Sequence, residues 1–382
     1  MPGDYAYYQF RLEVLSPVAA DSPFDSDTLW GRIVCALMEG SPAERSLAQG
    51  WLARLREGAA NLDHPFQPPL IVSEGFQCDR ENRPWLPVPF VVRLRWEAEV
   101  GEGRTLPRKA VKELECVPEK TFFDLCEGKE TDLKRLRVEC ADAPRTIPLL
   151  QPHLAMNRLS GIGLDRMLYM MPLAVYRAAR ETPDSSQLLR DPERRLEPPP
   201  RICFFLKILR DVDVALIDSA LKRLCDEGWG HAKSRGIGCV RSTPLEAWDP
   251  TKFEGTPNGF VSLSHFCPAA DNPAKGYWKI QAKHPVPAQF VDDKRVVLGA
   301  GSNWRVKSFL RLTAGSCFQL EGRPLRENYG RFLGDLLRPP VDDAEKNKLP
   351  SLFHYALSFS WPLNAPWPKY EGEWEDSTRQ GG

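Results

Sequence analysis

Four glycines and two basic residues lie close together between residues 228 and 238, and they could bind phosphate. The segment reads Gly228-Trp-Gly-His-Ala-Lys-Ser-Arg-Gly-Ile-Gly238, so Lys233 and Arg235 lie among the glycines. Glycine permits positive φ and lacks a Cβ, so backbone N–H groups can face phosphate oxygens while the two cations supply charge. A polyphosphate or an RNA backbone fits this chemistry, and an ordinary glycine-rich turn is an equal alternative.

The order of residues in this loop argues against nucleotide hydrolysis. The phosphate loop of nucleotide hydrolases reads Gly-x-x-x-x-Gly-Lys-Ser/Thr and follows a strand. Here Lys233 precedes the glycine pair Gly236 and Gly238, and the loop follows an expected helix. We therefore expect a binding loop of another kind.

The sequence offers little else for catalysis. The ten cysteines and six histidines are dispersed and no Cys-x-x-Cys occurs, so we expect no metal, no cofactor and reduced core cysteines. His231 beside Lys233 could cleave RNA by acid–base chemistry with the 2′-hydroxyl as nucleophile. An RNA-positioning role for His231 is as good, so we expect a protein that is not an enzyme.

A second polar segment, residues 153–169, could contact single-stranded RNA. It carries Asn157 and Arg158, followed by Ser160 and Gly161. Amides and guanidinium groups read unpaired bases. A solvated polar loop is the alternative.

A third segment, residues 301–311, alternates basic residues with Trp304, Val306 and Phe309, as on a strand with one basic face. Aromatic rings beside basic groups can stack on bases. Packing of these rings in a core is the commoner use.

Composition and charge bound the class of protein. At roughly 150 residues per domain, 382 residues indicate two to three domains, and 42% hydrophobic residues are typical of a globular chain. Fifty-one basic and fifty-one acidic residues give zero net charge, which argues against an indiscriminate polyanion coat. Acid gathers in Asp21–Asp27 and Glu371–Asp376, so separate basic and acidic surfaces are expected. Without an apolar run of about 20 residues or a secretory signal, we expect a cytoplasmic protein and no membrane partner.

The N-terminal elements are well marked. Residues 5–15 alternate apolar and polar side chains, which predicts a half-buried strand. A helix is expected to run to about Met38, capped by Ser26 or Asp27 and ended by Gly40. Ser41 and Glu44 form the capping box of a second helix.

The same plan recurs after a proline-rich break at residues 181–200. Residues 201–209 read as a strand, and Val214, Ile217, Leu221 and Leu224 form a helical stripe. We predict the α+β class with two ferredoxin-like, RRM-like domains with antiparallel sheets, one at 1–195 with inserted loops and one at 196–382 with the glycine-rich loop and acidic tail.

Several short motifs, in this order, resemble the RAMP superfamily, the repeat-associated RNA-binding proteins of CRISPR effector complexes. Within it they are similar to the fourth-subunit group of the type III-A Csm complex. The motifs cover most of the chain and are Ser26-Asp-Thr-Leu29, Leu86-Pro-Val-Pro89, residues 108–125, Asn157-Arg-Leu-Ser-Gly161, residues 228–238, Leu263-Ser264 and Gly315-Ser-Cys-Phe318. Trp229-Gly-His231 departs from the plain glycine pair of that group, which leaves the cap subunit of another type III system, such as type III-D, as an alternative.

The resemblance implies a non-catalytic subunit that binds the 5′ repeat-derived tag of crRNA, caps the backbone filament and docks the large signalling subunit. The implied partners are the crRNA 5′ tag, a large Cas-ten-type subunit and an adjacent backbone RAMP subunit. A metal-independent endoribonuclease acting on repeat RNA through His231 is the alternative. The residues expected to contact RNA are Asn157, Arg158, Gly228, Gly230, His231, Lys233, Ser234, Arg235, Gly236 and Gly238.

Overall fold

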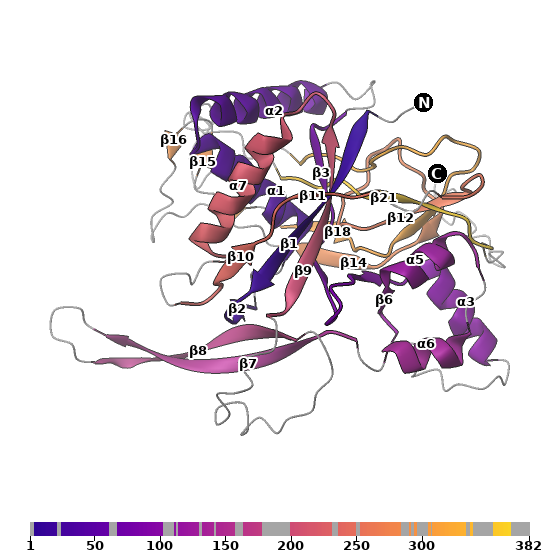
Figure 1. Ribbon diagram of the computed structural model, residues 1–382, viewed down its shortest axis with the longest axis horizontal. Coiled ribbons are helices and arrows are strands. Elements are labelled where there is room, and N and C mark those ends of the chain that lie inside the picture. Colours follow the sequence, from indigo (N-terminus) through magenta and orange to yellow (C-terminus); the bar gives the residue numbers. More distant parts are fainter. Residues whose placement is uncertain are drawn as a thin grey trace, which may run out of the picture.

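Figure 1 shows a computed structural model of the chain, in which helices and antiparallel sheets give the predicted α+β class. The structure describes residues 4–20, 24–60, 67–101, 111, 114–129, 132–140, 143–156, 163–177, 199–230, 236–249, 253–283, 290–291, 294–295, 305–306, 308–333, 337–338 and 354–367. Within these ranges, no helix has both the length and the apolar composition to cross a membrane.

A six-stranded antiparallel sheet forms the centre of the molecule, with the order β10-β1-β9-β3 along its main path. Two short strands join it, β11 beside β1 and β4 beside β9. Helices α1 and α7 lie together against one side of this sheet (Figure 1). The bounds are β1 Tyr5–Val14, α1 Ser26–Met38, β3 Leu70–Val72, β4 Phe76–Gln77, β9 Arg201–Leu209, α7 Val214–Glu227, β10 Val240–Ser242 and β11 Glu246–Ala247.

The main elements of this sheet follow the chain as β1-α1-β3-β9-α7-β10, which is the β-α-β-β-α-β order of a ferredoxin-like unit. The two central strands, β1 and β9, pair from Tyr5↔Leu209 to Glu13↔Arg201. The sequence interpretation placed them in separate halves, on either side of residue 195. The structure instead combines them in one sheet, because each strand–helix–strand segment leaves a strand edge that the other segment pairs.

Strand β9 is central because both of its faces are apolar. Phe204 packs on the helix side against Phe24 and Trp229, with ring centroids 6.4 and 6.1 Å away. Phe205 packs on the other side against Trp248 and Phe359, at 4.2 and 6.3 Å. A near-continuous apolar run is what a strand covered on both faces requires.

The start of α1 differs from the prediction. Asp25 occupies the N-cap position, and no side chain caps the helix there, so the expected cap by Ser26 or Asp27 is wrong. The Asp25 carboxylate instead faces Arg311 and Lys283, and the Ser26 hydroxyl donates to Glu74 at 2.8 Å. Charge pairing with distant residues therefore takes precedence over local capping. The helix ends at Met38, just before Gly40, as expected.

The capping box of α2 (Pro42–Ala60) is confirmed. The backbone N–H of Ser41 donates to Glu44 Oε2 at 2.6 Å, and the N–H of Glu44 donates to Ser41 Oγ at 3.3 Å. Glu44 is also buried and accepts from Arg223 of α7 at 2.9 Å. The same carboxylate thus starts α2 and joins it to α7.

A second antiparallel sheet, of order β13-β19-β12-β21, covers the side of β9 that faces away from α1 and α7. The buried ammonium group of Lys207 on β9 binds Glu327 Oε2 at 2.8 Å and the carbonyl oxygen of Ser360 at 2.9 Å. Apolar residues of both sheets belong to one continuous core. The bounds are β12 Gly259–Ser262, β13 Gly276–Tyr277, β19 Cys317–Gln319 and β21 Ser360–Leu363.

A long antiparallel hairpin of β7 (Arg145–Met156) and β8 (Gly163–Arg177) extends along the lower edge of the molecule in Figure 1. Strand β2 (Val18–Ala19) joins its base by pairing with β8. The other elements are β5 Trp85–Pro87, α3 Phe90–Gly101, β6 Cys116–Pro118, α5 Glu119–Cys126, α6 Leu133–Glu139, β14 Ile280–Lys283, β15 Phe290–Val291, β16 Lys294–Arg295, β17 Arg305–Val306, β18 Phe309–Leu312 and β20 Leu337–Arg338.

Candidate nucleic-acid interface

The glycine-rich loop leaves α7, and its two described ends are held together. The N–H of Trp229 donates to the carbonyl oxygen of Gly238 at 2.6 Å, and the N–H of Gly238 donates to that of Pro17 at 2.8 Å. Gly228, Gly230, Gly236 and Gly238 have φ of 82°, 83°, 72° and 77°. The expectation that these glycines supply positive φ is confirmed. They form the base of a loop that is tied to the connection between β1 and β2.

The glycines at the end of this loop serve different purposes. A Cβ on Gly238 would lie 1.8 Å from the carbonyl oxygen of Trp229, so only glycine fits this close backbone approach. A Cβ on Gly236 would meet nothing within 4 Å. At Gly236 the left-handed φ alone favours glycine, and the space beside its backbone is open to a ligand.

Trp229 anchors the loop from inside the core. Its side chain is fully buried, its rings lie 4.7 Å from Phe24, and the Arg32 guanidinium lies 5.3 Å from its ring centroid. The sequence comparison treated Trp229 as a departure from the family pattern. A large aromatic residue between two glycines could have indicated this anchor, because such a side chain is seldom left in solvent.

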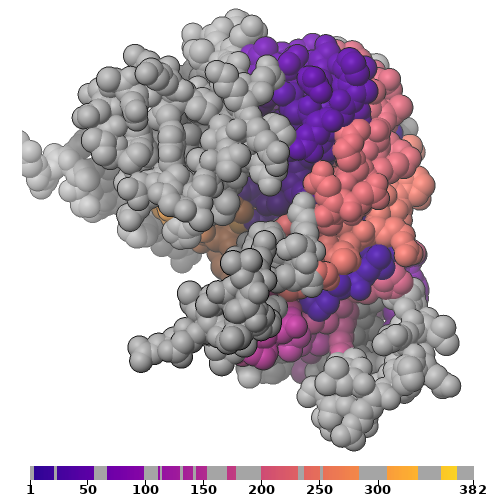
Figure 2. Space-filling model, turned by 90° about the vertical axis from the view of Figure 1, so that its left-hand side faces the viewer, coloured from indigo at the N-terminus to yellow at the C-terminus, as the bar shows by residue number. Residues whose placement is uncertain are grey.

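The hairpin and the glycine-rich loop meet at their bases. Leu173 of β8 and Ile237 of the loop are both buried and pack together, beside the pairing of Ala19 with Leu173. Figure 2 shows this side of the molecule, with the pink surface of α7 above the indigo segment before α1 and the magenta hairpin below. The two segments that sequence proposed for RNA contact are thus joined to neighbouring supports.

The tip of the hairpin lies where the Asn-Arg motif was found. Met156 pairs with Gly163 as the last pair of the ladder, so residues 157–162 connect β7 to β8. Asn157 and Arg158 are in this connection and lie outside the described residues, as do His231, Lys233, Ser234 and Arg235. Their RNA contacts stay predictions.

A pair of arginines at the base of the hairpin was missed in the sequence. Arg145 and Arg177 are directly opposite each other in the β7–β8 ladder, so their side chains share one face. Like charges in this position repel each other, and a phosphate between them would remove the repulsion. Register alone reveals this pair, because the two residues are far apart in the sequence.

The third sequence candidate, residues 301–311, does not present a basic face over its described part. Arg311 is 4% exposed and lies 2.8 Å from Asp25 Oδ2 and 3.5 Å from Asp27 Oδ1. The ammonium group of Lys283 lies 2.9 Å from Asp25 and 3.1 Å from Asp27. This charge cluster, comprising Asp25, Asp27, Lys283 and Arg311, joins α1 to the β14–β18 ribbon.

Electrostatics in the charge cluster favour the ionised carboxylates. Burial opposes ionisation of Asp27, but hydrogen bonding from His354 and the nearby cations hold its pKa well below the usual range. Burial also acts against Asp25, and Arg311 and Lys283 hold the pKa of Asp25 low. The cluster is therefore a set of matched ion pairs.

Asp25, Glu74 and His265 bring metal-ligating atoms within 4.8 Å of one another. Arg311 and Lys283 already neutralise Asp25, and Ser26 donates to Glu74. A divalent cation would have to displace these partners, so we assign no metal to this group.

No protein family and no curated protein matches the sequence. Solved structures do match. A chain of the crystal structure of a Csm3–Csm4 subcomplex in the type III-A CRISPR-Cas interference complex is 12% identical, with a TM-score of 0.53, over 94% of this chain and 99% of that chain. A chain of a Csm1–Csm4 cassette in complex with cA4 is 15% identical, with a TM-score of 0.51, over 95% of this chain and 100% of that chain.

Csm4 is the subunit that these two complexes share. The chain therefore has the fold of a Csm4-like RAMP subunit along nearly its whole length. The resemblance seen in the sequence is confirmed at the level of the fold.

Proposed function

We propose that this protein is a non-catalytic, Csm4-like subunit of a type III CRISPR effector complex in the cytoplasm. It binds the 5′ repeat-derived tag of crRNA, caps the backbone filament and docks the large signalling subunit. The observation that carries the proposal is the Csm4-like fold, which covers 94–95% of the chain. The proposal includes a second ferredoxin-like unit built on the sheet β13-β19-β12-β21.

The arrangement of the RNA-facing elements supports this function. The base of the glycine-rich loop packs on the base of the hairpin through Ile237 and Leu173. Lys233, Arg235 and the Asn157-Arg158 motif belong to the segments that extend from these bases. Backbone N–H groups beside glycines, together with guanidinium groups, suit a single-stranded RNA whose bases are unpaired.

The matching complexes supply the partner classes. One holds Csm4 with Csm1 and the other holds Csm4 with Csm3. By analogy, the partners of this chain are a Csm1-like large subunit and a Csm3-like backbone subunit. Zero net charge fits a subunit that binds RNA within an assembly, because a neutral chain has little general attraction for polyanions.

A gel-shift with cleavage scoring tests the proposal. Purified protein, alone and co-expressed with its large subunit, is mixed in metal-free buffer with labelled crRNA bearing an intact or a scrambled 5′ tag. We expect binding that depends on the tag, strongest with the large subunit present, and intact RNA.

His231→Ala is the control for catalysis, and we expect it to leave RNA binding nearly unchanged. Discrete cleavage that disappears in His231→Ala would replace this proposal with a processing endoribonuclease. Equal binding of intact and scrambled tags would also contradict it.

A further inference from the structure

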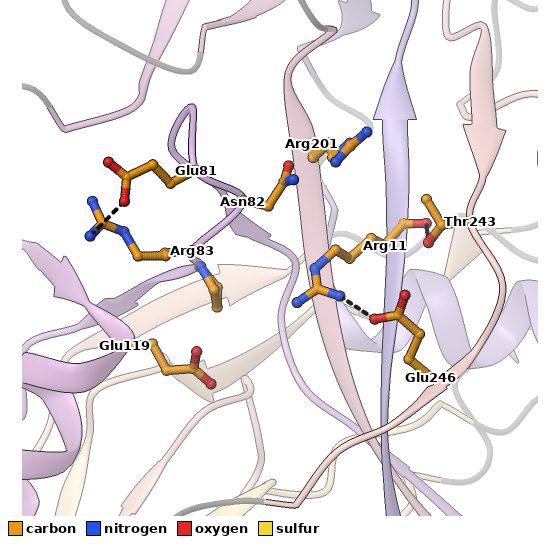
Figure 3. Close-up of a pocket in the computed structure, with 9 residues that line it drawn as sticks. Arg11, Glu81, Asn82, Arg83, Glu119, Arg201, Thr243 and Glu246 are labelled. Atoms are coloured by element: carbon orange, nitrogen blue, oxygen red, sulfur yellow. Dashed lines mark hydrogen bonds and ion pairs between the residues drawn. The ribbon is translucent and has the colours of Figure 1, made fainter.

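A polar pocket of about 380 Å³ lies on the opposite side of β1 and β9 from the two helices. One wall is the turn between β4 and β5 with the first residue of α5, and the other wall is β1, the start of β9 and the segment leading into β11 (Figure 3). Three arginines and three glutamates are among its lining residues. The pocket is separate from the glycine-rich loop and the hairpin tip.

The arginines of this pocket are already paired with carboxylates. Arg11 lies 2.7 Å from Glu246, and Arg83 lies 2.8 Å from Asp79. The guanidinium of Arg201 lies 2.7 Å from Glu13. An incoming phosphate would have to compete with each of these carboxylates for its guanidinium group.

Glu119 differs from the other acidic residues of the pocket. Among the described residues it has no ion pair within 4 Å, and Figure 3 shows its carboxylate pointing into the gap between the two walls. The indole of Trp248 donates a hydrogen bond to this carboxylate, which fixes its direction. Trp248 packs between Phe205 and Trp361, so the surroundings of Glu119 on that side are apolar.

Burial raises the pKa of Glu119, although Arg11 and Trp248 act in the opposite direction. The nearest arginine therefore does not compensate fully for the loss of water around the carboxylate. A second cation placed in the gap would do so, because opposite charges close together favour the ionised form.

We propose that this pocket binds a basic side chain, the guanidinium of Arg or the ammonium of Lys, from a partner protein, with Glu119 as its principal ligand. Glu81 and Glu246 lie at the rim, 70% and 57% exposed, where they attract the approaching cation. Arg83 and Arg11 hold these two rim carboxylates in place. The pocket is thus a protein-docking site on the face opposite the candidate RNA interface.

This inference goes beyond the proposed function and does not depend on it. RNA is disfavoured as the occupant because a phosphate would meet three glutamates and only arginines that are already paired. A basic side chain finds the one carboxylate that is turned inward. The charge pattern therefore selects a cationic guest.

A ligand titration with a small cation tests the pocket directly. The probe is N-acetyl-arginine amide, which carries one guanidinium and no other charge, followed by ligand-observed NMR with the full chain at low salt. We expect saturable binding by the wild type, loss of at least about tenfold in affinity for Glu119→Gln, and no binding of the uncharged N-acetyl-citrulline amide. Glu139→Gln, on the exposed face of α6, is the matched control and should bind as the wild type.

Two further measurements keep the inference open to refutation. Glu119→Asp retains the charge and should bind the arginine probe better than Glu119→Gln, even if both variants are less stable to heat. Equal binding of the arginine and citrulline probes, unchanged binding by Glu119→Gln, or preferential binding of AMP that competes with the arginine probe would each overturn it.

Discussion

The guanidinium of Arg311 lies 2.8 Å from the carboxylate of Asp25, and the two side chains are only 5% and 8% exposed. Arg311 belongs to β18 and Asp25 precedes α1, so this pair joins the β14–β18 ribbon to the ferredoxin-like unit. Removing one partner of a buried ion pair leaves an uncompensated charge, whereas an exposed pair contributes little.

Asp25→Asn should lower the free energy of unfolding by about 3 kcal/mol, because Arg311 and Lys283 then share the single carboxylate of Asp27. Urea unfolding at neutral pH measures this loss. Arg135→Gln on α6 is the control, since Arg135 is 81% exposed and its pair with Glu139 should contribute within about 0.5 kcal/mol. Equal losses in the two variants would show that the buried pair is no stronger than the exposed one.

Glu44 should make stability depend on acid pH. Burial opposes its ionisation, but hydrogen bonds from Ser41 and Arg223 hold the pKa of Glu44 at about 2, below the ordinary value of about 4.3. Its contribution is therefore fully present above about pH 4.3 and is lost as the pH falls toward 2.

Glu44→Gln should accordingly be less stable than the wild type at pH 7, and the difference should shrink between about pH 5 and pH 2. Urea unfolding across this range measures both chains. A constant difference at every pH would mean that the Glu44 charge does not contribute to stability.

Alanine substitutions should separate the two glycines at the end of the loop. Gly238→Ala forces a Cβ to within 1.8 Å of the Trp229 carbonyl oxygen, so we expect a shifted backbone and loss of RNA binding. Gly236→Ala meets no atom and adds only the strain of a left-handed alanine, roughly 1 kcal/mol. Thermal unfolding and the gel-shift compare them, and similar behaviour of both variants would contradict the close-approach argument.

Arg145→Gln combined with Arg177→Gln should weaken binding to single-stranded RNA. If each arginine neutralises one phosphate, the slope of log affinity against log salt should fall by about 0.7 for each residue. Relief of the repulsion between the two arginines predicts that the free protein does not become less stable. An unchanged salt slope would exclude the hairpin base from the RNA interface.

Lys233→Ala with Arg235→Ala tests the glycine-rich loop itself. Both residues lie outside the described part of the chain, so the expectation rests on their position among the glycines. Binding should weaken equally for all RNA sequences, and the salt slope should fall by about one unit for each lost phosphate contact. Filter binding at several salt concentrations measures this, and a sequence-dependent loss would indicate base contacts instead.

Local patterns in the sequence determined the elements. The alternation in residues 5–15, the stripe from Val214 to Leu224 and the Ser41–Glu44 box predicted β1, α7 and the start of α2, because each depends on neighbours within a few residues. The glycines of residues 228–238 likewise indicated positive φ, which is a property of the residue itself. The order of short motifs was enough to indicate the Csm4-like fold.

Tertiary structure decided how these elements combine. Pairing of β1 with β9 across nearly 200 residues, the burial of Arg311 against Asp25 and the opposition of Arg145 to Arg177 depend on register and packing between distant segments. The same holds for Glu119, whose lack of a cation is visible only when both walls of its pocket are in place. Sequence spacing carries no information on such contacts, because hydrophobic burial and charge compensation act through space and not along the chain.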